Sequence, residues 1–288
     1  MAEFLRLFAH TMLLRPYVFV FLLIYLVASA AHLGWRRTLL YIPAGYIIAW
    51  ASEYSSIHWG IPYGRYCYIT NTSELWVAGV PFMDSLSYVF LSYASFATAL
   101  FILSPVRWIN GTVYVLETHR HRRSWETLLL AGILMVLLDI IIDPLALRGD
   151  RWFLGRIYEY PVVGNYFGVP FSNFLGWFLT GLAMVKTIQL FDQVTILEPA
   201  RPSRITGVKY MNMVGTLLYM GIIVFNLFIT LWIKEYLLAL VGCLMVSFPL
   251  ILVLFLTAYK NRYPNPCALS EHLRDFPYSP AALIAQYR

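Results

Sequence analysis

Two stretches of this sequence are nearly the same, GVPFMDSLSY at residues 79–88 and GVPFSNFLGW at residues 168–177. In both, Gly-Val-Pro-Phe is followed at identical spacing by an acid or amide, a leucine and an aromatic residue. A Gly-Arg pair lies upstream of each, at residues 64–65 and 155–156, and acidic residues precede each loop. This duplication predicts an internal repeat that builds one site from two half-sites.

The composition indicates a membrane protein. Of the 288 residues, 60% are hydrophobic and 12% are charged. The apolar residues form long continuous runs, which excludes a soluble domain of this size and also a β-barrel. We therefore predict an all-α, polytopic membrane helix bundle that forms a single domain over residues 1–288. The formal net charge of +6 comes from basic residues at helix ends, so no nucleic-acid partner is expected.

The apolar runs predict seven membrane spans. They cover residues 17–33, 39–52, 82–103, 128–142, 171–190, 217–233 and 236–259. The repeat halves are about residues 39–103 and 128–190, and residues 191–288 add two further spans and a cytoplasmic tail. Residues 1–15 mix apolar with basic side chains, which is typical of a short helix that lies at the membrane interface.

The distribution of basic residues predicts the orientation. With seven spans, 14 of the 21 Lys and Arg residues fall on one face of the membrane. The positive-inside rule then puts the N-terminus outside and the C-terminus in the cytoplasm. Both repeat loops, about residues 53–81 and 143–170, fall on the outer side, so the repeat is parallel rather than inverted. Both loops are rich in Tyr, Trp, Gly and Pro, so we expect them to fold back onto the bundle and meet over a shared cavity.

Four acidic residues are the candidate catalytic groups: Glu53, Asp84, Asp139 and Asp143. They lie at or near membrane depth, where an ionisable side chain is costly and function is the usual reason for keeping it. Glu53 ends the second predicted span, Asp84 opens the third, and Asp143 ends the fourth. Asp139 and Asp143 are one helical turn apart, so in a low dielectric the pair would keep a proton available near neutral pH. The alternative is that each acid only caps a helix or pairs with a neighbouring arginine, namely Arg65, Arg148 or Arg156.

Four aromatic residues recur within the repeated motifs: Tyr66, Tyr68, Tyr166 and Trp177. Aromatic faces attract a cation and suit a long polyene, whereas most other Tyr and Trp residues fit an interfacial belt. Asn173 takes the place of Asp84 in the second copy, which indicates an acid in one half-site and a neutral hydrogen-bonding group in the other.

Several sites that would need a cofactor or metal are missing from the sequence. It contains neither a Gly-rich phosphate loop nor a dinucleotide fingerprint, so no nucleotide or flavin is expected. Cys67, Cys243 and Cys267 lack paired spacing, so neither a disulfide framework nor a zinc site is implied. The triplet His119-Arg120-His121 stands alone on a basic loop and is interpreted as a solvated charge cluster.

Over roughly residues 40–190 the chain resembles the CruF-like carotenoid hydratases, the membrane family that includes bisanhydrobacterioruberin hydratase. The resemblance rests on Glu53, GIPYGRYCY at residues 60–68, Gly79-Val80-Pro81, Asp143-Pro144 and residues 166–177. Two stretches depart from the family pattern, residues 56–59 and the unusually basic residues 147–157. Both fall where the substrate would be selected.

The resemblance implies that water is added across the terminal 1,2 double bond of an acyclic (ψ) carotenoid end group, without metal or redox cofactor. A carboxylic acid would protonate C2, a tertiary cation would form at C1, and water would add to it. Asp139 or Asp143 would be the proton donor, and Glu53 would orient the water or balance the cation. The aromatic residues and Asn173 would line the pocket. The implied setting is the lipid bilayer of a prokaryotic cell membrane, with a lipophilic carotenoid as the partner.

Two other interpretations stay open. A carotenoid end-group cyclase would form the same cation but lose a proton instead of adding water. A non-enzymatic carotenoid-binding or transport protein is also compatible with a parallel repeat and buried acids.

The duplicated motif makes a geometric prediction. If each Gly-Val-Pro starts a helix, the loops should pack over one cavity. The four acids and Asn173 should then converge around that cavity, with Tyr66 and Tyr166 closing its outer side. Otherwise the repeat reflects only the chemistry of a helix start, and the acids face separate neighbours.

Overall fold

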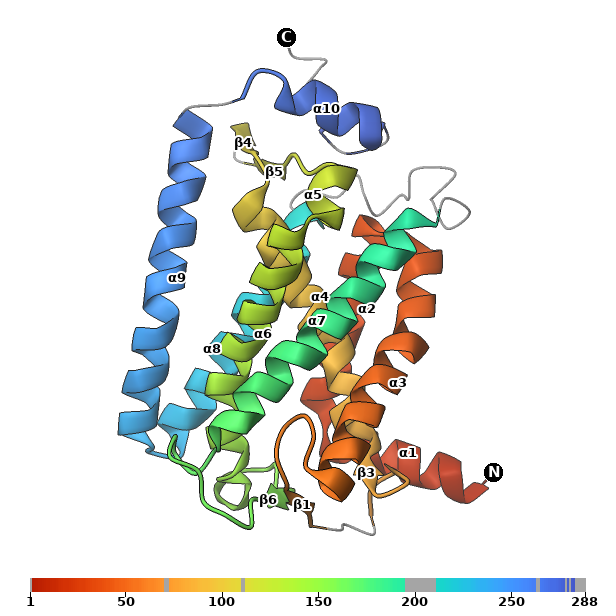
Figure 1. Ribbon diagram of the computed structural model, residues 1–288, viewed down its shortest axis with the longest axis vertical. Coiled ribbons are helices and arrows are strands. Elements are labelled where there is room, and N and C mark those ends of the chain that lie inside the picture. The colour runs from red at the N-terminus through yellow and green to blue at the C-terminus, as the bar shows by residue number, and fades with distance from the viewer. Residues whose placement is uncertain are drawn as a thin grey trace.

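The computed structural model describes residues 2–69, 73–109, 112–194, 211–262 and 265–277, together with 279, 281 and 282. Long helices run between two ends of an elongated bundle (Figure 1). The helices are α1 (Ala2–Leu14), α2 (Pro16–His32), α3 (Trp35–Trp59), α4 (Phe82–Leu103), α5 (His119–Arg123), α6 (Trp125–Ala146), α7 (Phe171–Gln193), α8 (Val214–Trp232), α9 (Tyr236–Arg262) and α10 (Ala268–Asp275), with the short 3-10 helices η1 (Gly149–Arg151) and η4 (Met211–Met213). Short strands form three pairs: β1 (Cys67–Tyr68) with β6 (Tyr158–Glu159), β2 (Trp76–Val77) with β3 (Val80–Pro81), and β4 (Val106–Ile109) with β5 (Thr112–Val115).

Each predicted span corresponds to one of the long helices α2, α3, α4, α6, α7, α8 and α9. Among the described residues, α4, α6, α7, α8 and α9 are long and apolar enough to cross a membrane. The pair α1 and α2 also qualifies when taken together, although it is bent by 92°. The protein is therefore an all-α, helical membrane protein, and the count of seven spans stays a prediction.

Several predicted span boundaries differ from the helices by a few residues, and two of them bear on the site. The helix α3 continues to Trp59, and α6 runs through Pro144 to Ala146. Glu53 and Asp143 therefore lie within helices rather than at their ends, and neither caps a helix. The charged side chains shortened the apolar runs on which the boundaries were based, whereas the helical hydrogen bonding continues past them.

The two Gly-Val-Pro motifs adopt the same turn. Ala78-Gly79 has φ values of 48° and 83°, and Phe167-Gly168 has values of 50° and 99°. The residues on either side of each turn pair antiparallel, Val77 with Val80 and Tyr166 with Val169. Two consecutive positive φ values are typical of tight two-residue hairpin turns, which favour glycine. The sequence repeat is thus matched by equal backbone geometry at these residues.

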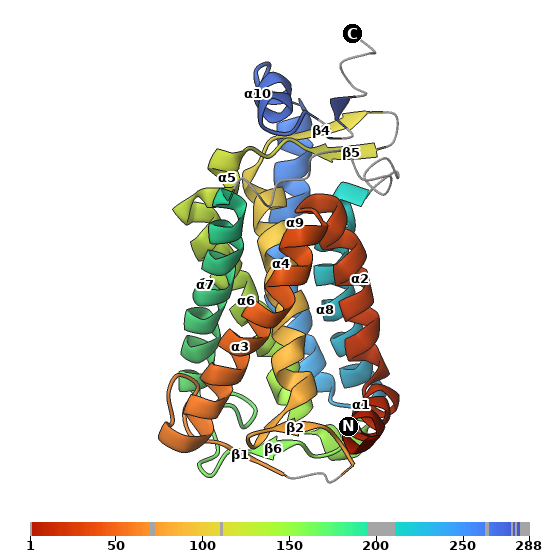
Figure 2. The same ribbon diagram turned by 90° about the vertical axis from the view of Figure 1, so that its right-hand side faces the viewer.

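Each turn leads directly into a helix, because Pro81 immediately precedes α4 and Pro170 immediately precedes α7. Each proline holds the N-cap position, one residue before the first turn in which it was expected. Both helices start at the same end of the bundle, and β1 lies beside β6 there (Figure 2). Since β1 belongs to the first repeat loop and β6 to the second, the prediction that the loops meet is confirmed.

The first loop also packs on the second copy's helix α7. The Tyr63 hydroxyl donates to Thr180 Oγ1 at 2.9 Å, and Ser172 Oγ donates to the Tyr63 carbonyl at 3.1 Å. A Cβ atom added at Gly176 would lie 2.4 Å from Tyr63 Cδ1, so only glycine allows this approach. The two copies therefore interlock rather than sit side by side.

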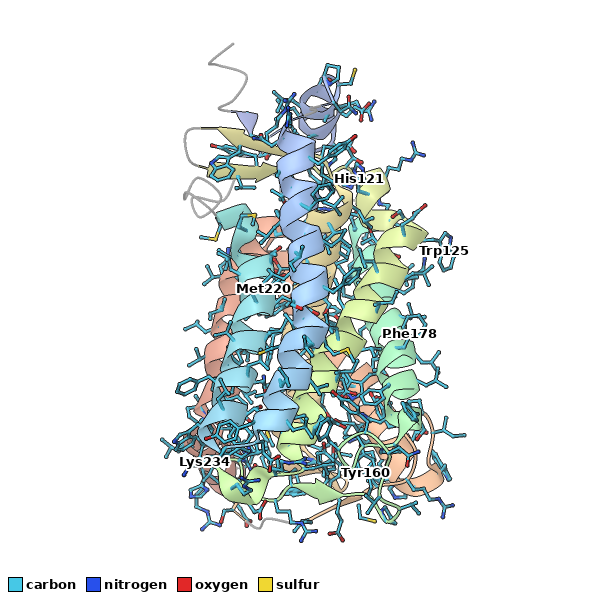
Figure 3. The ribbon with its side chains drawn as sticks, turned by 90° about the vertical axis from the view of Figure 1, so that its left-hand side faces the viewer. His121, Trp125, Tyr160, Phe178, Met220 and Lys234 are labelled. Carbon is cyan, nitrogen blue, oxygen red and sulfur yellow. The ribbon has the colours of Figure 1, made fainter. Side chains whose placement is uncertain are left out.

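The opposite end of the bundle holds a buried ion network. Asp192 on α7 contacts Arg122 at 3.2 Å, Arg123 at 2.8 Å and His119 at 3.0 Å. The interpretation of residues 119–121 as a solvated charge cluster is therefore wrong for His119, whose partner Asp192 is 1% exposed. Folding brings that acid, 73 residues away, onto the basic loop. Figure 3 shows His121 at this end and Tyr160 at the other.

Candidate functional site

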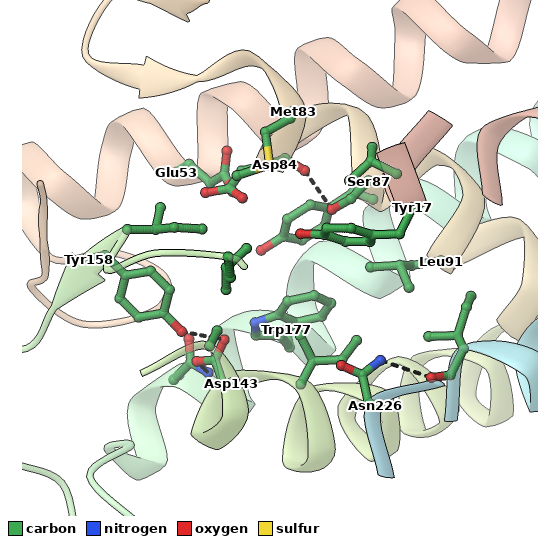
Figure 4. Close-up of a pocket in the computed structure, with 18 of the residues that line it drawn as sticks. Tyr17, Glu53, Met83, Asp84, Ser87, Leu91, Asp143, Tyr158, Trp177 and Asn226 are labelled. Atoms are coloured by element: carbon green, nitrogen blue, oxygen red, sulfur yellow. Dashed lines mark hydrogen bonds between the residues drawn. The ribbon is translucent and has the colours of Figure 1, made fainter. Parts of the chain in front are cut away.

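A cavity of about 960 Å³, which includes space open to the surroundings, lies beneath the two repeat loops. It is lined by the helices α2, α3, α4, α6, α7 and α8 and by both loops (Figure 4). One part of the wall is polar and carries Glu53, Asp84, Asp143, Tyr66, Tyr68, Tyr158, Tyr160 and Asn173. The rest is mostly apolar and includes Val18, Phe21, Phe90, Leu91, Ile222 and Phe225. Such a cavity fits an apolar ligand with one reactive end.

The first carboxyl pair comes from α3 and α4. Glu53 is 3% exposed and accepts a hydrogen bond from Ser85 Oγ at 2.6 Å. The carboxyl group of Asp84 lies next to that of Glu53 on the same side of the cavity (Figure 4). Two neighbouring carboxyl groups in a buried wall favour a state in which they share a proton.

The second carboxyl pair comes from α6 and is held by α7. The amide Nδ2 of Asn173 donates one hydrogen bond to Asp139 Oδ2 and one to Asp143 Oδ2, each at 2.7 Å. The two carboxyl groups therefore lie close to each other. Asp143 also accepts from the hydroxyls of Tyr158 at 2.8 Å and Tyr160 at 3.0 Å. One amide therefore holds both carboxyl groups in a fixed arrangement.

Asp139 lies behind this wall. It is fully buried, and its Oδ1 is without a hydrogen-bond partner among the described residues. Buried carboxylate oxygens normally accept hydrogen bonds, so an orphan oxygen beside a second carboxyl group favours a proton there. Asp143 lines the cavity and Asp139 does not. Within this pair, only Asp143 can meet a ligand directly.

The acids do not form the arginine pairs that the sequence left open. In the described part of the chain, Arg148 pairs with Glu235, and Arg156 pairs with Glu159. Arg65 is exposed on the first loop and forms no ion pair within 4.0 Å there. Among the described residues, none of the carboxyl groups that line the cavity forms an ion pair with a cation.

Four tyrosines link the two carboxyl pairs. Tyr66 packs edge-to-face against Tyr158 at 5.8 Å and Tyr160 at 6.1 Å, and Tyr68 packs against Tyr158 at 6.3 Å. Burial raises the pKa of all four hydroxyls, with Glu53 adding to the effect at Tyr66 and Tyr68 and Asp143 at Tyr158 and Tyr160. These hydroxyls therefore stay protonated and act as hydrogen-bond donors and acceptors rather than as bases.

Tyr88 and Trp177 form another aromatic wall of the cavity. Their rings stack at 4.5 Å with 19° between the planes. These residues hold equivalent positions in the two copies of the motif, so the stack joins the copies to each other. The faces of such rings attract positive charge.

The structure gathers most of the predicted site residues around this one cavity. Its lining includes Glu53, Asp84, Asp143, Tyr66, Tyr68, Asn173 and Trp177. The prediction that Tyr166 lines the pocket is wrong. Its side chain does not line the cavity and packs instead against Phe167 and Phe174. The hairpin turn directs its ring onto the first turn of α7 rather than toward Tyr66.

Sequence reasoning missed several residues at the site: Tyr63, Tyr88, Ser85, Tyr158 and Tyr160. Tyr88 could have been found, because it occupies the place of Trp177 in the first copy. Tyr158 and Tyr160 gave no such signal, since only the pairing of β1 with β6 brings them to the acids.

Comparisons with known proteins identify the family of the chain. Residues 11–249 match the family model described as carotenoid biosynthesis protein. Over 218 residues the chain is 29% identical to bisanhydrobacterioruberin hydratase from Haloarcula japonica, and the match covers 75% of this chain and 66% of that protein. No solved structure matches the chain. Because the family model spans most of its length, the chain belongs to the carotenoid biosynthesis protein family.

Proposed function

We propose that the protein is a cofactor-independent carotenoid hydratase that adds water to the terminal 1,2 double bond of an acyclic (ψ) end group. The observation that carries this proposal is the cavity with a carboxyl pair from each repeat copy and an apolar remainder. The family and the hydratase relative support the substrate class. The product is a tertiary alcohol.

Asp143 is the proton donor in this proposal. It faces the cavity and shares its proton with Asp139, while Asn173 fixes both carboxyl groups. Transfer of the proton to C2 of the end group leaves a tertiary cation at C1. The stacked rings of Tyr88 and Trp177 and the carboxylate left at Asp143 stabilise that cation.

Glu53 and Asp84 complete the addition from the other side of the cavity. Figure 4 shows them opposite Asp143 and Tyr158, so a water beside them can attack C1 while it gives up a proton to the pair. The reaction then needs a proton to return to Asp143. Tyr158 and Tyr160 donate to Asp143, Tyr66 donates to Tyr68, and the rings of these four tyrosines pack together. We assign the return of the proton to this tyrosine cluster, so each turnover consumes only water.

The proposal is tested by expressing the protein in a host that makes lycopene and measuring the masses of the pigments. Hydration adds the mass of one water for each end that reacts. Pigment with unchanged mass but a cyclic end group would identify a cyclase. Pigment that is retained by the protein and recovered unchanged would favour a binding or transport protein.

A further inference from the structure

The cavity has a second end, opposite the carboxyl groups. Figure 4 shows Glu53 and Asp143 at one end of the cavity and Leu91 and Asn226 at the other. This far end is walled by α4 and by the helices α2 and α8, which lie side by side (Figure 2). The proposed reaction uses only the carboxyl end, so the far end has no role in it.

Three aromatic rings close the far end between α2 and α8. Phe225 on α8 stacks on Tyr17 at 5.5 Å and meets Phe21 edge-on at 5.7 Å, and all three residues line the cavity. Tyr17 also contacts Phe153, which is 49% exposed, so this group of rings reaches from the cavity to the surface. In the described part of the chain, no hydrogen bond or ion pair joins α2 to α8. We call the contact of Phe225 with Tyr17 and Phe21 the α2–α8 seam, and ring packing holds it closed.

The outer surface beside this seam is apolar and has a gap. Gly221 and Phe228 lie one helical turn on either side of Phe225, so the three residues share one face of α8. Phe228 is 64% exposed, and a Cβ atom added at Gly221 would meet nothing within 4 Å. On α2, Val20 next to Phe21 is 54% exposed. Phe225 therefore lies between the cavity and an apolar surface on a helix that is long and apolar enough to cross a membrane.

The two repeat loops close the cavity at the carboxyl end. Buried Arg15 donates to the two carboxylate oxygens of Glu74 in the first loop at 3.1 and 2.6 Å, and to the Leu154 carbonyl in the second. A guanidinium that holds a carboxylate through two hydrogen bonds fixes its geometry, so Arg15 ties both loops to the start of α2. A long ligand at the carboxyl groups therefore has its apolar path along α2 and α8 rather than out through the loops.

From this arrangement we infer that the α2–α8 seam is a lateral portal through which the polyene chain of the carotenoid extends from the cavity into the bilayer. The inference rests on the proposed function for the identity of the ligand. A conjugated polyene is rigid, so it does not fold back when its end group lies at the carboxyl groups. It is also apolar and is more stable in lipid than in water. Phe225 is the ring that moves to admit the chain, and the gap at Gly221 receives it.

The first experiment places an amino acid with a diazirine side chain at position 228 of the full chain, in a host that makes lycopene. Its matched control has the same amino acid at position 240. Phe228 and Leu240 are 64% and 56% exposed, and each lies four residues from the end of its helix at the α8–α9 turn. Illumination converts the diazirine into a carbene that bonds to a neighbouring molecule, and the mass of the protein shows whether that molecule is the pigment.

Pigment should attach severalfold more often at position 228 than at position 240, because a chain held in the seam stays beside position 228. Equal attachment at the two positions, or none at either, would overturn the inference.

The second experiment fills the gap with Gly221→Trp. An overlap with the chain on the scale of overpacking should lower the ratio of hydrated to unhydrated pigment by about 5- to 100-fold. The matched control is Leu240→Trp, which adds the same ring to the exposed face of α9 and should keep the wild-type ratio. Protein level in the membrane is the check on folding, and equal ratios in the two variants would contradict the portal.

The two proposals fail separately. The crosslinking result stands even if Gly221→Trp does not fold. Pigment attached at position 228 in a protein that leaves lycopene unchanged would overturn the proposed function alone. Hydration of lycopene with equal attachment at positions 228 and 240 would overturn the portal alone.

Discussion

Replacing Asp143 with asparagine should remove the reaction while leaving the fold nearly intact. The new amide nitrogen cannot take the Oδ2 position, because Asn173 Nδ2 already donates there at 2.7 Å. It takes the Oδ1 position instead, where the Tyr158 hydroxyl can turn from donor to acceptor at the same 2.8 Å separation. The loss is at most about one net hydrogen bond, about 1 kcal/mol of unfolding free energy.

The catalytic effect of Asp143→Asn should be much larger, because the group that protonates C2 is gone. Removal of a general acid lowers the rate by about 10²–10⁴-fold, or roughly 3–5 kcal/mol of barrier. Hydrated pigment is measured in a lycopene-producing host, with protein level in the membrane as the check on folding. The matched control is Asp150→Asn, which changes an exposed acid on η1 and should behave as wild type.

Asp139→Asn tests whether the two carboxyl groups act as a unit. If they share one proton, the double variant should be no worse than Asp143→Asn, because residues that act together are not additive. Full activity in both single variants, or independent losses that multiply in the double variant, would refute the shared-proton mechanism.

Three further outcomes are expected. Gly176→Ala should destabilise the protein by about 1–3 kcal/mol and lower its Tm, since the added methyl group meets the Tyr63 backbone and ring at 2.8 and 2.4 Å. Cys67 and Cys267 are both exposed and lie at opposite ends of the bundle. A membrane-impermeant maleimide added to intact cells should therefore label Cys67 but not Cys267, and equal labelling would contradict the predicted orientation. His272 on α10 bonds to the Glu117 carbonyl at 2.6 Å, and burial lowers the pKa of its imidazole. The unfolded state therefore binds more protons than the folded state, so the packing of α10 should weaken as the pH falls below about 6.5. When hydrogen exchange of α10 is divided by the intrinsic exchange rate at each pH, the protection should be lower at pH 5.5 than at pH 7.5, and equal protection would count against this role.

The sequence alone was sufficient for the fold class, and most of the site residues that it predicted line the cavity. Long apolar runs have few stable arrangements other than membrane helices, because every backbone polar group must be satisfied within the helix. The duplicated Gly-Val-Pro motif predicted where two helices start, because glycine and proline act through local backbone geometry. The same duplication placed Asp84 and Asn173 in matching positions, and both line the cavity.

Only the tertiary structure decided which acid faces the cavity and what surrounds it. Asp139 and Asp143 share one helix face in the sequence, but the packing of α7 against α6 puts Asp139 behind Asn173 and leaves Asp143 in front. Tyr158 and Tyr160 reach Asp143 because β6 pairs with β1, a contact across about 90 residues that no local pattern encodes. Helix formation depends on neighbouring residues in the chain, whereas the chemistry of a side chain depends on the distant groups that folding brings to it.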